Sequence, residues 1–187
     1  DPHWMAEGAR FVEGQGAKII DINMGCPSKR VTTGLCGSAL LRDLDLALVS
    51  RDHARRGTLL FHEPMVWVGA PQFELWRRDP LPIAVYEDAS LARRGAIQSL
   101  AQQGRRYKVV YNSSSLAGQI AAVESGLAVA ALTQCSAPEH LQVLGAEHGL
   151  GPVEPMEVAA YRSSESRGNK AVDSLHSLLI KTLRLSD

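Results

Sequence analysis

Apolar and polar positions form alternating blocks along the chain, and these blocks predict strands and helices in turn. Short, continuous apolar runs at residues 17–22 and 45–50 have the length of buried strands. From residue 83 onward the order becomes regular. Strands are predicted at 83–86, 107–112 and 127–132, with helices at 90–103 and 113–125, the second ended by Gly126. A β-α-β-α-β order implies parallel strands joined by right-handed crossovers, so we predict an α/β fold.

The segments around this regular part are less uniform. Residues 58–68 are apolar but include Pro64, which lacks a backbone donor, so this segment is predicted as an edge strand or two short strands. Residues 70–82 hold three prolines and are predicted to cross between two lobes, with 148–155 as the return crossing. We also expect helices at 2–15, 138–146 and 169–185, the start of another at 35–41, and a strand at 156–161.

Composition and charge argue against several classes of function. The 187 residues carry 20 basic and 20 acidic side chains, and this balance argues against a chain that works mainly by gripping nucleic acid. No apolar run reaches the roughly 18 residues that a membrane helix needs. Three cysteines without paired spacing predict neither a disulfide framework nor a metal site. We therefore expect a cytoplasmic protein without a metal or a membrane partner.

Cys26 stands in a glycine-bearing loop after a predicted strand, where α/β proteins place chemistry. On composition alone, an ordinary loop cysteine is the alternative. The run from Asn23 to Pro27 (Asn-Met-Gly-Cys-Pro), with its flanks through residue 41, closely resembles the tRNA-dihydrouridine synthase family. The resemblance implies FMN as cofactor, tRNA as substrate, Cys26 as proton donor to the uracil ring and Asn23 near the flavin. Such a barrel needs eight strand–helix units, and this segment of residues 1–45 supplies at most two.

From about residue 44 the chain resembles the effector-binding domain of LysR-type transcriptional regulators. The resemblance is carried by residues 44–49, 63–68, 113–116, 121–130 and 158–163, in that order. It implies a periplasmic-binding-protein-like fold of two lobes with a small-molecule effector between them, and a homodimer. We assign residues 44–70 and 155–187 to lobe I and 80–150 to lobe II. Lobe I is then incomplete and partly built from residues 1–45, with strand 17–22 pairing beside 45–49.

A ligand contact is predicted at the start of the second lobe's helix 113–125, where three serines stand in a row. Ser113, Ser114 and Ser115 follow a strand directly, and free N–H groups at a helix start favour an anion such as a carboxylate. An ordinary N-cap serine is the alternative interpretation. Thr133 and Gln134 follow the next strand and are predicted at the same end of the sheet.

Three hypotheses about function follow. The first is a ligand-sensing domain that is not an enzyme, needs no cofactor, and does not bind DNA directly because no winged helix-turn-helix is present. The second is a fragment of an FMN-dependent synthase. The third, which is compatible with the first, is a chimera without natural activity.

Overall fold

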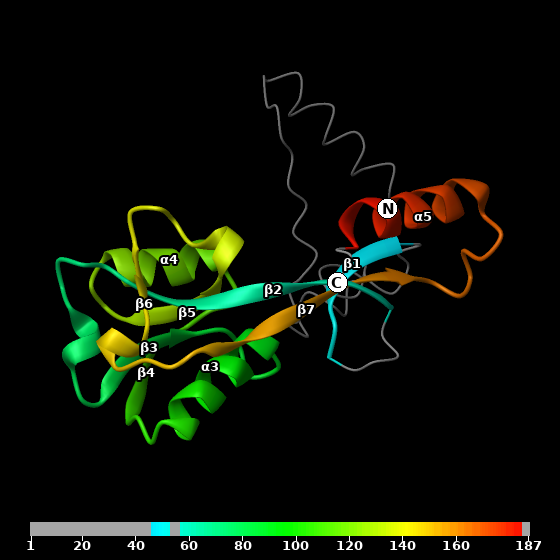
Figure 1. Cartoon of the computed structure of the whole chain (residues 1–187). Coiled ribbons are helices and arrows are strands. Elements are labelled where there is room, and N and C mark those ends of the chain that lie inside the picture. The colour runs from blue at the N-terminus through cyan, green and yellow to red at the C-terminus, as the bar shows by residue number, and fades with distance from the viewer. Residues whose placement is uncertain (1–45, 53–56, 185–187) are drawn as a thin grey trace, which may run out of the picture. The chain divides into compact units, whose positions relative to one another are not determined.

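The structure is a computed structural model that describes residues 46–52 and 57–184 (Figure 1). The chain divides into two compact units, Asp1–Leu44 and Asp45–Asp187, and every described residue belongs to the second. The elements predicted before residue 45, and their predicted place in lobe I, lie outside the described residues.

Seven strands of the described part form one sheet in the order β1-β7-β2-β5-β3-β4, with β6 also pairing with β2. Strand β3 runs parallel to both β4 and β5, which confirms the parallel pairing predicted from the strand–helix alternation. All other pairs are antiparallel. The strands are β1 (Leu46–Ser50), β2 (Thr58–Gly69), β3 (Leu81–Val85), β4 (Tyr107–Asn112), β5 (Val129–Thr133), β6 (Gln142–Leu144) and β7 (Val153–Arg162).

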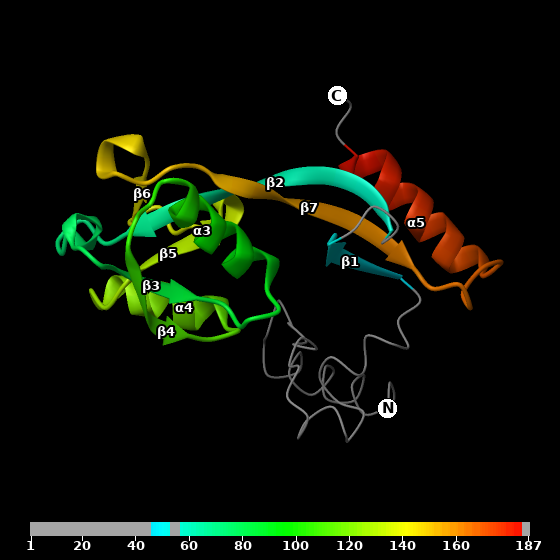
Figure 2. The ribbon, with the colours of Figure 1, turned by 90° about the horizontal axis from the view of Figure 1, so that it is seen from below.

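Strands β2 and β7 are the longest and run together through the middle of the sheet (Figure 2). The prediction of an edge strand or two short strands around Pro64 was wrong: β2 is one strand, paired with β7 and β6 on one side and with β5 on the other. The register with β7 shifts between Glu63 and Met65. This irregularity brackets Pro64, so the missing backbone donor falls where the ladder is already interrupted.

Three α-helices accompany the sheet: α3 (Leu91–Gln102), α4 (Leu116–Glu124) and α5 (Lys170–Leu183). Single 3-10 turns occur at η2 (Leu75–Arg77), η3 (Gln134–Ser136) and η4 (Ala146–His148). The helix predicted at 138–146 was wrong, because this segment contains β6, which pairs with β2 from Trp67 to Gly69. Pairing with a strand distant in sequence overrode the local preference there.

Helices α3 and α4 cover opposite faces of the parallel strands (Figure 1). Strand β5 shows why: Val129 and Ala131 belong to the core cluster under α3, whereas Ala130 and Leu132 belong to the cluster under α4. This period of two is the signature of a strand buried on both faces. The three-layer arrangement fixes which residues face α3, the side on which a cavity opens.

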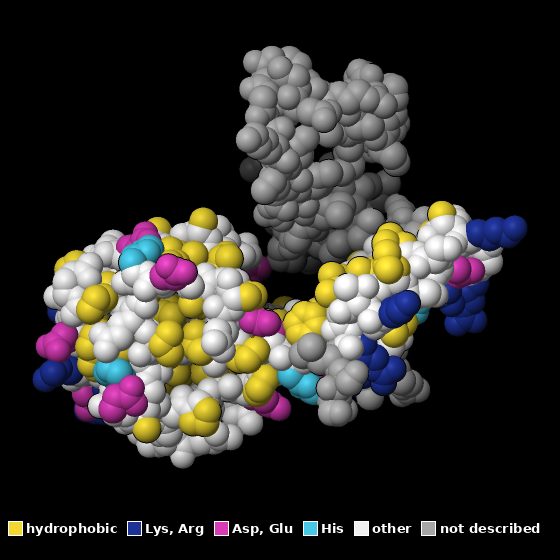
Figure 3. Space-filling view, turned by 45° about the horizontal axis from the view of Figure 1, so that its top comes forward, with side chains coloured by type: hydrophobic (Ala, Val, Ile, Leu, Met, Phe, Trp, Pro, Cys, Tyr) yellow, Lys and Arg dark blue, Asp and Glu magenta, His cyan; other side chains and the backbone are white. Residues whose placement is uncertain are grey.

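Helix α5 is packed more lightly. Asn169 caps its start and Arg162 pairs with Asp173, but the helix has no fully buried residue. Leu175 and Leu178 are 50% and 58% exposed. Figure 3 shows that hydrophobic side chains also reach the surface elsewhere in the described part. The stable core of the described part therefore lies under α3 and α4.

Candidate functional site

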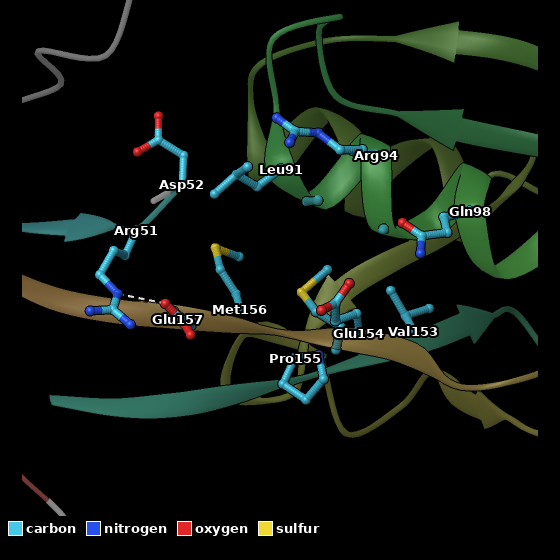
Figure 4. Close-up of a pocket in the computed structure, with 13 residues that line it drawn as sticks. Arg51, Asp52, Leu91, Arg94, Gln98, Val153, Glu154, Pro155, Met156 and Glu157 are labelled. Carbon is cyan, nitrogen blue, oxygen red and sulfur yellow. Dashed lines mark hydrogen bonds and ion pairs between the residues drawn. The ribbon is translucent and has the colours of Figure 1, made fainter. Parts of the chain in front are cut away.

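A cavity of about 370 Å³ opens between α3 and β7 (Figure 4). This volume is near the lower end of the range of roughly 300–1,000 Å³ that small-molecule sites occupy. Four elements contribute to its wall. The lining residues are Leu91, Ala92, Arg94, Gly95 and Gln98 of α3, Val153 to Glu157 of β7, Met65 of β2, and Arg51 and Asp52, which follow β1.

Helical spacing explains the contribution of α3. Leu91, Arg94, Gly95 and Gln98 recur at intervals of three and four residues, so they share one face of the helix. Gly95 lets the helix approach β7 closely, because a Cβ atom there would lie 3.3 Å from Cγ1 of Val153. The helix therefore forms one wall of the cavity, with Leu91 at the start of the stripe, Arg94 in its middle and Gln98 at its end.

The start of α3 is fixed by its own polar contacts. Ser90 Oγ accepts a hydrogen bond from the Arg93 N–H, as an N-cap does. The Arg93 guanidinium donates to the Tyr86 carbonyl at 3.1 Å and lies 2.9 Å from Asp88. Arg93 thus holds the preceding loop, while its neighbour Arg94 lines the cavity.

At the other end of the cavity, both the side chain and the backbone of Arg51 are hydrogen-bonded to β7. Its Nε donates to Glu157 Oε2 at 2.5 Å, and its backbone N–H donates to the Glu157 carbonyl at 2.8 Å. This bond lowers the pKa of the Glu157 carboxyl and raises that of the Arg51 guanidinium. His62, the cross-strand neighbour of Glu157, adds a contact of 3.6 Å. The pair ties the residue after β1 to the long strand β7.

Two lining residues of opposite charge have no side-chain partner among the described residues. Within residues 46–52 and 57–184, no ion pair or side-chain hydrogen bond involves Arg94 of α3 or Glu154 of β7. Leu91, Val153 and Met156 add apolar surface to the lining in Figure 4. A small-molecule site usually combines apolar surface with a few polar groups that orient the ligand.

The serines predicted to contact a ligand lie outside this cavity, at the start of α4. Ser115 is the N-cap, and its Oγ accepts from the Gly118 N–H. Ser113 Oγ accepts from the Ser115 N–H at 3.1 Å, and Ser114 is exposed. Ser115 thus caps the helix, which was the alternative interpretation of these residues, and the role of all three serines as ligand contacts stays a prediction.

Thr133 and Gln134 lie at the end of β5. Because β4 and β5 are both parallel to β3, the two predicted groups stand at the same edge of the sheet. Thr133 pairs in register with Met65, which lines the cavity, and its hydroxyl lies 2.7 Å from that of Ser136. Gln134 is exposed. Thr133 is therefore the predicted residue that lies next to a lining residue.

Sequence reasoning missed Arg94, Gln98 and Glu154. The stripe at 91, 94, 95 and 98 was readable as one helix face, but which neighbour that face meets depends on tertiary packing. Cys26 and Asn23 lie outside the described residues.

The described residues hold no group of three or more potential metal ligands. Among the same residues, no helix has the length and hydropathy required to cross a membrane.

Comparison with known proteins gives two matches along the chain. The family described as LysR substrate binding domain matches residues 31–184, and the family described as Dihydrouridine synthase (Dus) matches residues 1–51. The chain is 39% identical over 113 residues to the HTH-type transcriptional regulator DgdR of Burkholderia cepacia, which covers 60% of this chain and 38% of DgdR. It is 60% identical over 48 residues to a probable tRNA-dihydrouridine synthase of Rhizobium leguminosarum bv. phaseoli, which covers 26% of this chain and 15% of the relative.

Solved structures that resemble this chain include LysR-type regulators. The full-length LysR-type regulator HypT of Salmonella typhimurium superposes with a TM-score of 0.61 at 17% identity, covering 87% of this chain and 57% of HypT. The regulatory domain of CcmR from Synechocystis PCC6803, solved with 2-PG, gives 0.56 at 12% identity, covering 98% and 92%.

The described part thus has the mixed α/β fold of two-lobed regulatory domains, as predicted. The chain belongs to the LysR substrate binding domain family, and its first 51 residues match a fragment of the dihydrouridine synthase family. It is an effector domain of the kind found in LysR-type transcriptional regulators. The chain spans about 38% of the length of the regulator DgdR.

Proposed function

We propose that this chain senses a small molecule carrying a carboxylate, and that the effector binds in the cavity between α3 and β7. The observation that carries this proposal is a cavity of about 370 Å³ in which Arg94 is the guanidinium without a partner among the described residues. Arg51, the other lining guanidinium, is hydrogen-bonded to Glu157. A guanidinium binds a carboxylate through two parallel hydrogen bonds, which gives orientation as well as affinity.

The position of the cavity supports a sensing role. Its wall includes the residues that follow β1, the first half of strand β7 and the helix α3, so a bound ligand would touch three segments that are distant in sequence. A ligand can shift a conformational equilibrium only by its differential affinity for the two states. Contacts made from several elements at once provide that difference.

The proposal is tested by calorimetry on the 187-residue chain with a panel of aliphatic and aromatic carboxylates. Replacing Arg94 by Gln removes a charge-assisted pair worth about 1.5–3 kcal/mol, so affinity should fall roughly 10- to 100-fold. Arg78→Gln is the matched control, because Arg78 is exposed and lies outside the cavity. If no member of the panel binds at millimolar concentration, or if both variants weaken binding equally, the proposal is wrong.

The serine-fronted start of α4 is the second candidate for the carboxylate. It includes Ser113, Ser114 and Ser115, with Thr133 and Gln134 at the same sheet edge. Its test is Ser114→Ala, because Ser114 is exposed and, unlike those of Ser113 and Ser115, its hydroxyl accepts no hydrogen bond from the backbone of the described residues. A loss of affinity in this variant with unchanged affinity in Arg94→Gln would move the carboxylate to α4.

We further propose a homodimer in the cytoplasm that does not bind DNA through this chain. The formal net charge of zero supports the second point, since DNA binding relies on clustered basic side chains. Sedimentation equilibrium measures the oligomer, and a mobility-shift assay at low salt measures DNA binding.

An enzymatic function remains the second candidate because the match to dihydrouridine synthases at residues 1–51 includes Cys26 and Asn23. We favour sensing because the LysR family match spans residues 31–184 and the synthase family match only 1–51. Titration with FMN, followed by flavin fluorescence, separates the two functions. Micromolar FMN binding, lost in Asn23→Ala, would favour the synthase.

A further inference from the structure

We infer that the effector is a zwitterion with a compact apolar body, such as an aliphatic α-amino acid, and that Glu154 recognises its ammonium group. The inference rests on the proposed function of the cavity and adds the second charge of the ligand. It depends on which charged groups of the lining already have an interaction partner and which do not.

Five charged side chains line the cavity, and three of them already take part in an interaction. Arg51 and Glu157 are hydrogen-bonded to each other at 2.5 Å, and Asp52 has an interaction of its own. The remaining two are Arg94 on α3 and Glu154 on β7, neither of which has an ion-pair or side-chain hydrogen-bond partner among the described residues. The cavity therefore offers one available cation and one available anion.

The two available charges lie on different walls. Figure 4 shows the Arg94 side chain on the helix and that of Glu154 on the strand, while Leu91 and Met156 supply apolar surface. The two groups are not paired with each other in the structure. Both side chains are exposed. A ligand with two opposite charges can use both groups, whereas a ligand with a single charge uses only one of them.

Electrostatics then favours a zwitterion over either singly charged class. A simple carboxylate can use Arg94 alone, and a simple amine can use Glu154 alone. A ligand that carries both charges can form a second charge-assisted hydrogen bond, which is stronger than a bond between neutral groups. A zwitterion satisfies both groups and brings no net charge into the cavity.

Size and lining restrict the body of the ligand. A volume of about 370 Å³ suits a molecule of amino-acid size rather than a long peptide. Val153 and Met156 present apolar surface, and the unbranched thioether of methionine adapts to ligands of different shape. We therefore expect an apolar side chain on the ligand, and tolerance for small changes in its branching.

The test compares matched ligands on the 187-residue chain by isothermal titration calorimetry. The ligands are aliphatic α-amino acids from alanine to leucine, each beside the carboxylic acid that lacks its amino group and the amine that lacks its carboxyl group. For leucine these are 4-methylpentanoic acid and 3-methylbutylamine. We expect at least one amino acid to bind 10-fold or more tightly than both of its partners.

Two variants assign the charges. Glu154→Gln should weaken amino-acid binding about 10-fold while changing the affinity for the carboxylic acid less than twofold, and Arg94→Gln should weaken both. Glu139→Gln, an exposed glutamate outside the cavity, is the control, and thermal melting confirms that each variant is folded.

The outcomes separate the two proposals. Equal or tighter binding of the carboxylic acids overturns the zwitterion and leaves the sensing of a carboxylate intact. Tight amino-acid binding that Glu154→Gln does not change overturns the role of Glu154. Failure of every amino acid and every carboxylic acid to bind overturns the proposed function and this inference together.

Discussion

Replacing the buried Gln119 by Met tests the account of how the ends of the parallel strands are held. Gln119 of α4 is fully buried, and its Nε2 donates to the carbonyls of Val85 and Ser113, both at 2.7 Å. These carbonyls mark the ends of β3 and β4. Met has a similar length and an apolar tip, so the variant removes both hydrogen bonds with little change of shape.

The cost follows from what each carbonyl retains. The Val85 carbonyl keeps a second hydrogen bond, from the Ser113 N–H at 3.1 Å. Losing the bond from Gln119 should therefore cost about 0.5–1 kcal/mol of stability at this carbonyl. The carbonyl of Ser113 loses its side-chain donor, which costs about 1–3 kcal/mol if that oxygen stays buried. Gln119 Oε1 is buried and has no hydrogen-bond partner among the described residues, and removing it returns about 1 kcal/mol. The net destabilisation should therefore be about 0.5–3 kcal/mol.

Urea denaturation followed by circular dichroism measures this change as a lower midpoint at constant slope. Gln102→Met is the matched control, because Gln102 lies on the exposed side of α3 and should change the free energy of unfolding by less than about 0.5 kcal/mol. A loss below about 0.5 kcal/mol in Gln119→Met would refute the reasoning, since the two hydrogen bonds would then contribute nothing beyond what water supplies.

Three further predictions concern other contacts. Ser115→Ala removes the N-cap of α4 and should cost about 1 kcal/mol in the same urea assay, whereas an unchanged midpoint would mean that the cap contributes nothing. Gly126→Ala places a side chain at φ 70° and a Cβ 2.5 Å from the Phe73 ring, so the thermal midpoint should drop by several degrees; a rise would contradict the geometry. The Arg51 guanidinium holds the pKa of Glu157 below its ordinary value of 4.5. The stability from this pair should be complete above about pH 4.5 and be lost as the pH falls through the folded-state pKa, and acid titration of Glu157→Gln should lack this component.

Local sequence pattern determined the regular half of the fold. The apolar runs and helix stops between residues 83 and 132 predict three strands and two helices, and the structure has β3, α3, β4, α4 and β5 there in that order. Parallel pairing followed because helical crossovers return the chain to the same end of the sheet. The order and spacing of the motifs also identified the family, which the family match over residues 31–184 confirms.

Tertiary structure decided what local pattern could not. Pro64 suggested an edge, yet β2 is central, because a register shift absorbs the missing donor. Residues 138–146 favoured a helix, yet β6 forms there, because the free edge of β2 offers backbone partners.

The candidate site divides in the same way. Sequence alone placed Thr133 and the serines from Ser113 to Ser115 at one edge of the sheet, since strand order fixes where loops emerge. It could not find the cavity, whose wall joins residue 51, which follows β1, to residues 65, 94 and 154 of β2, α3 and β7. Which helix face meets which strand is set by packing between distant segments, so the common wall that includes Arg94 and Glu154 became visible only in three dimensions.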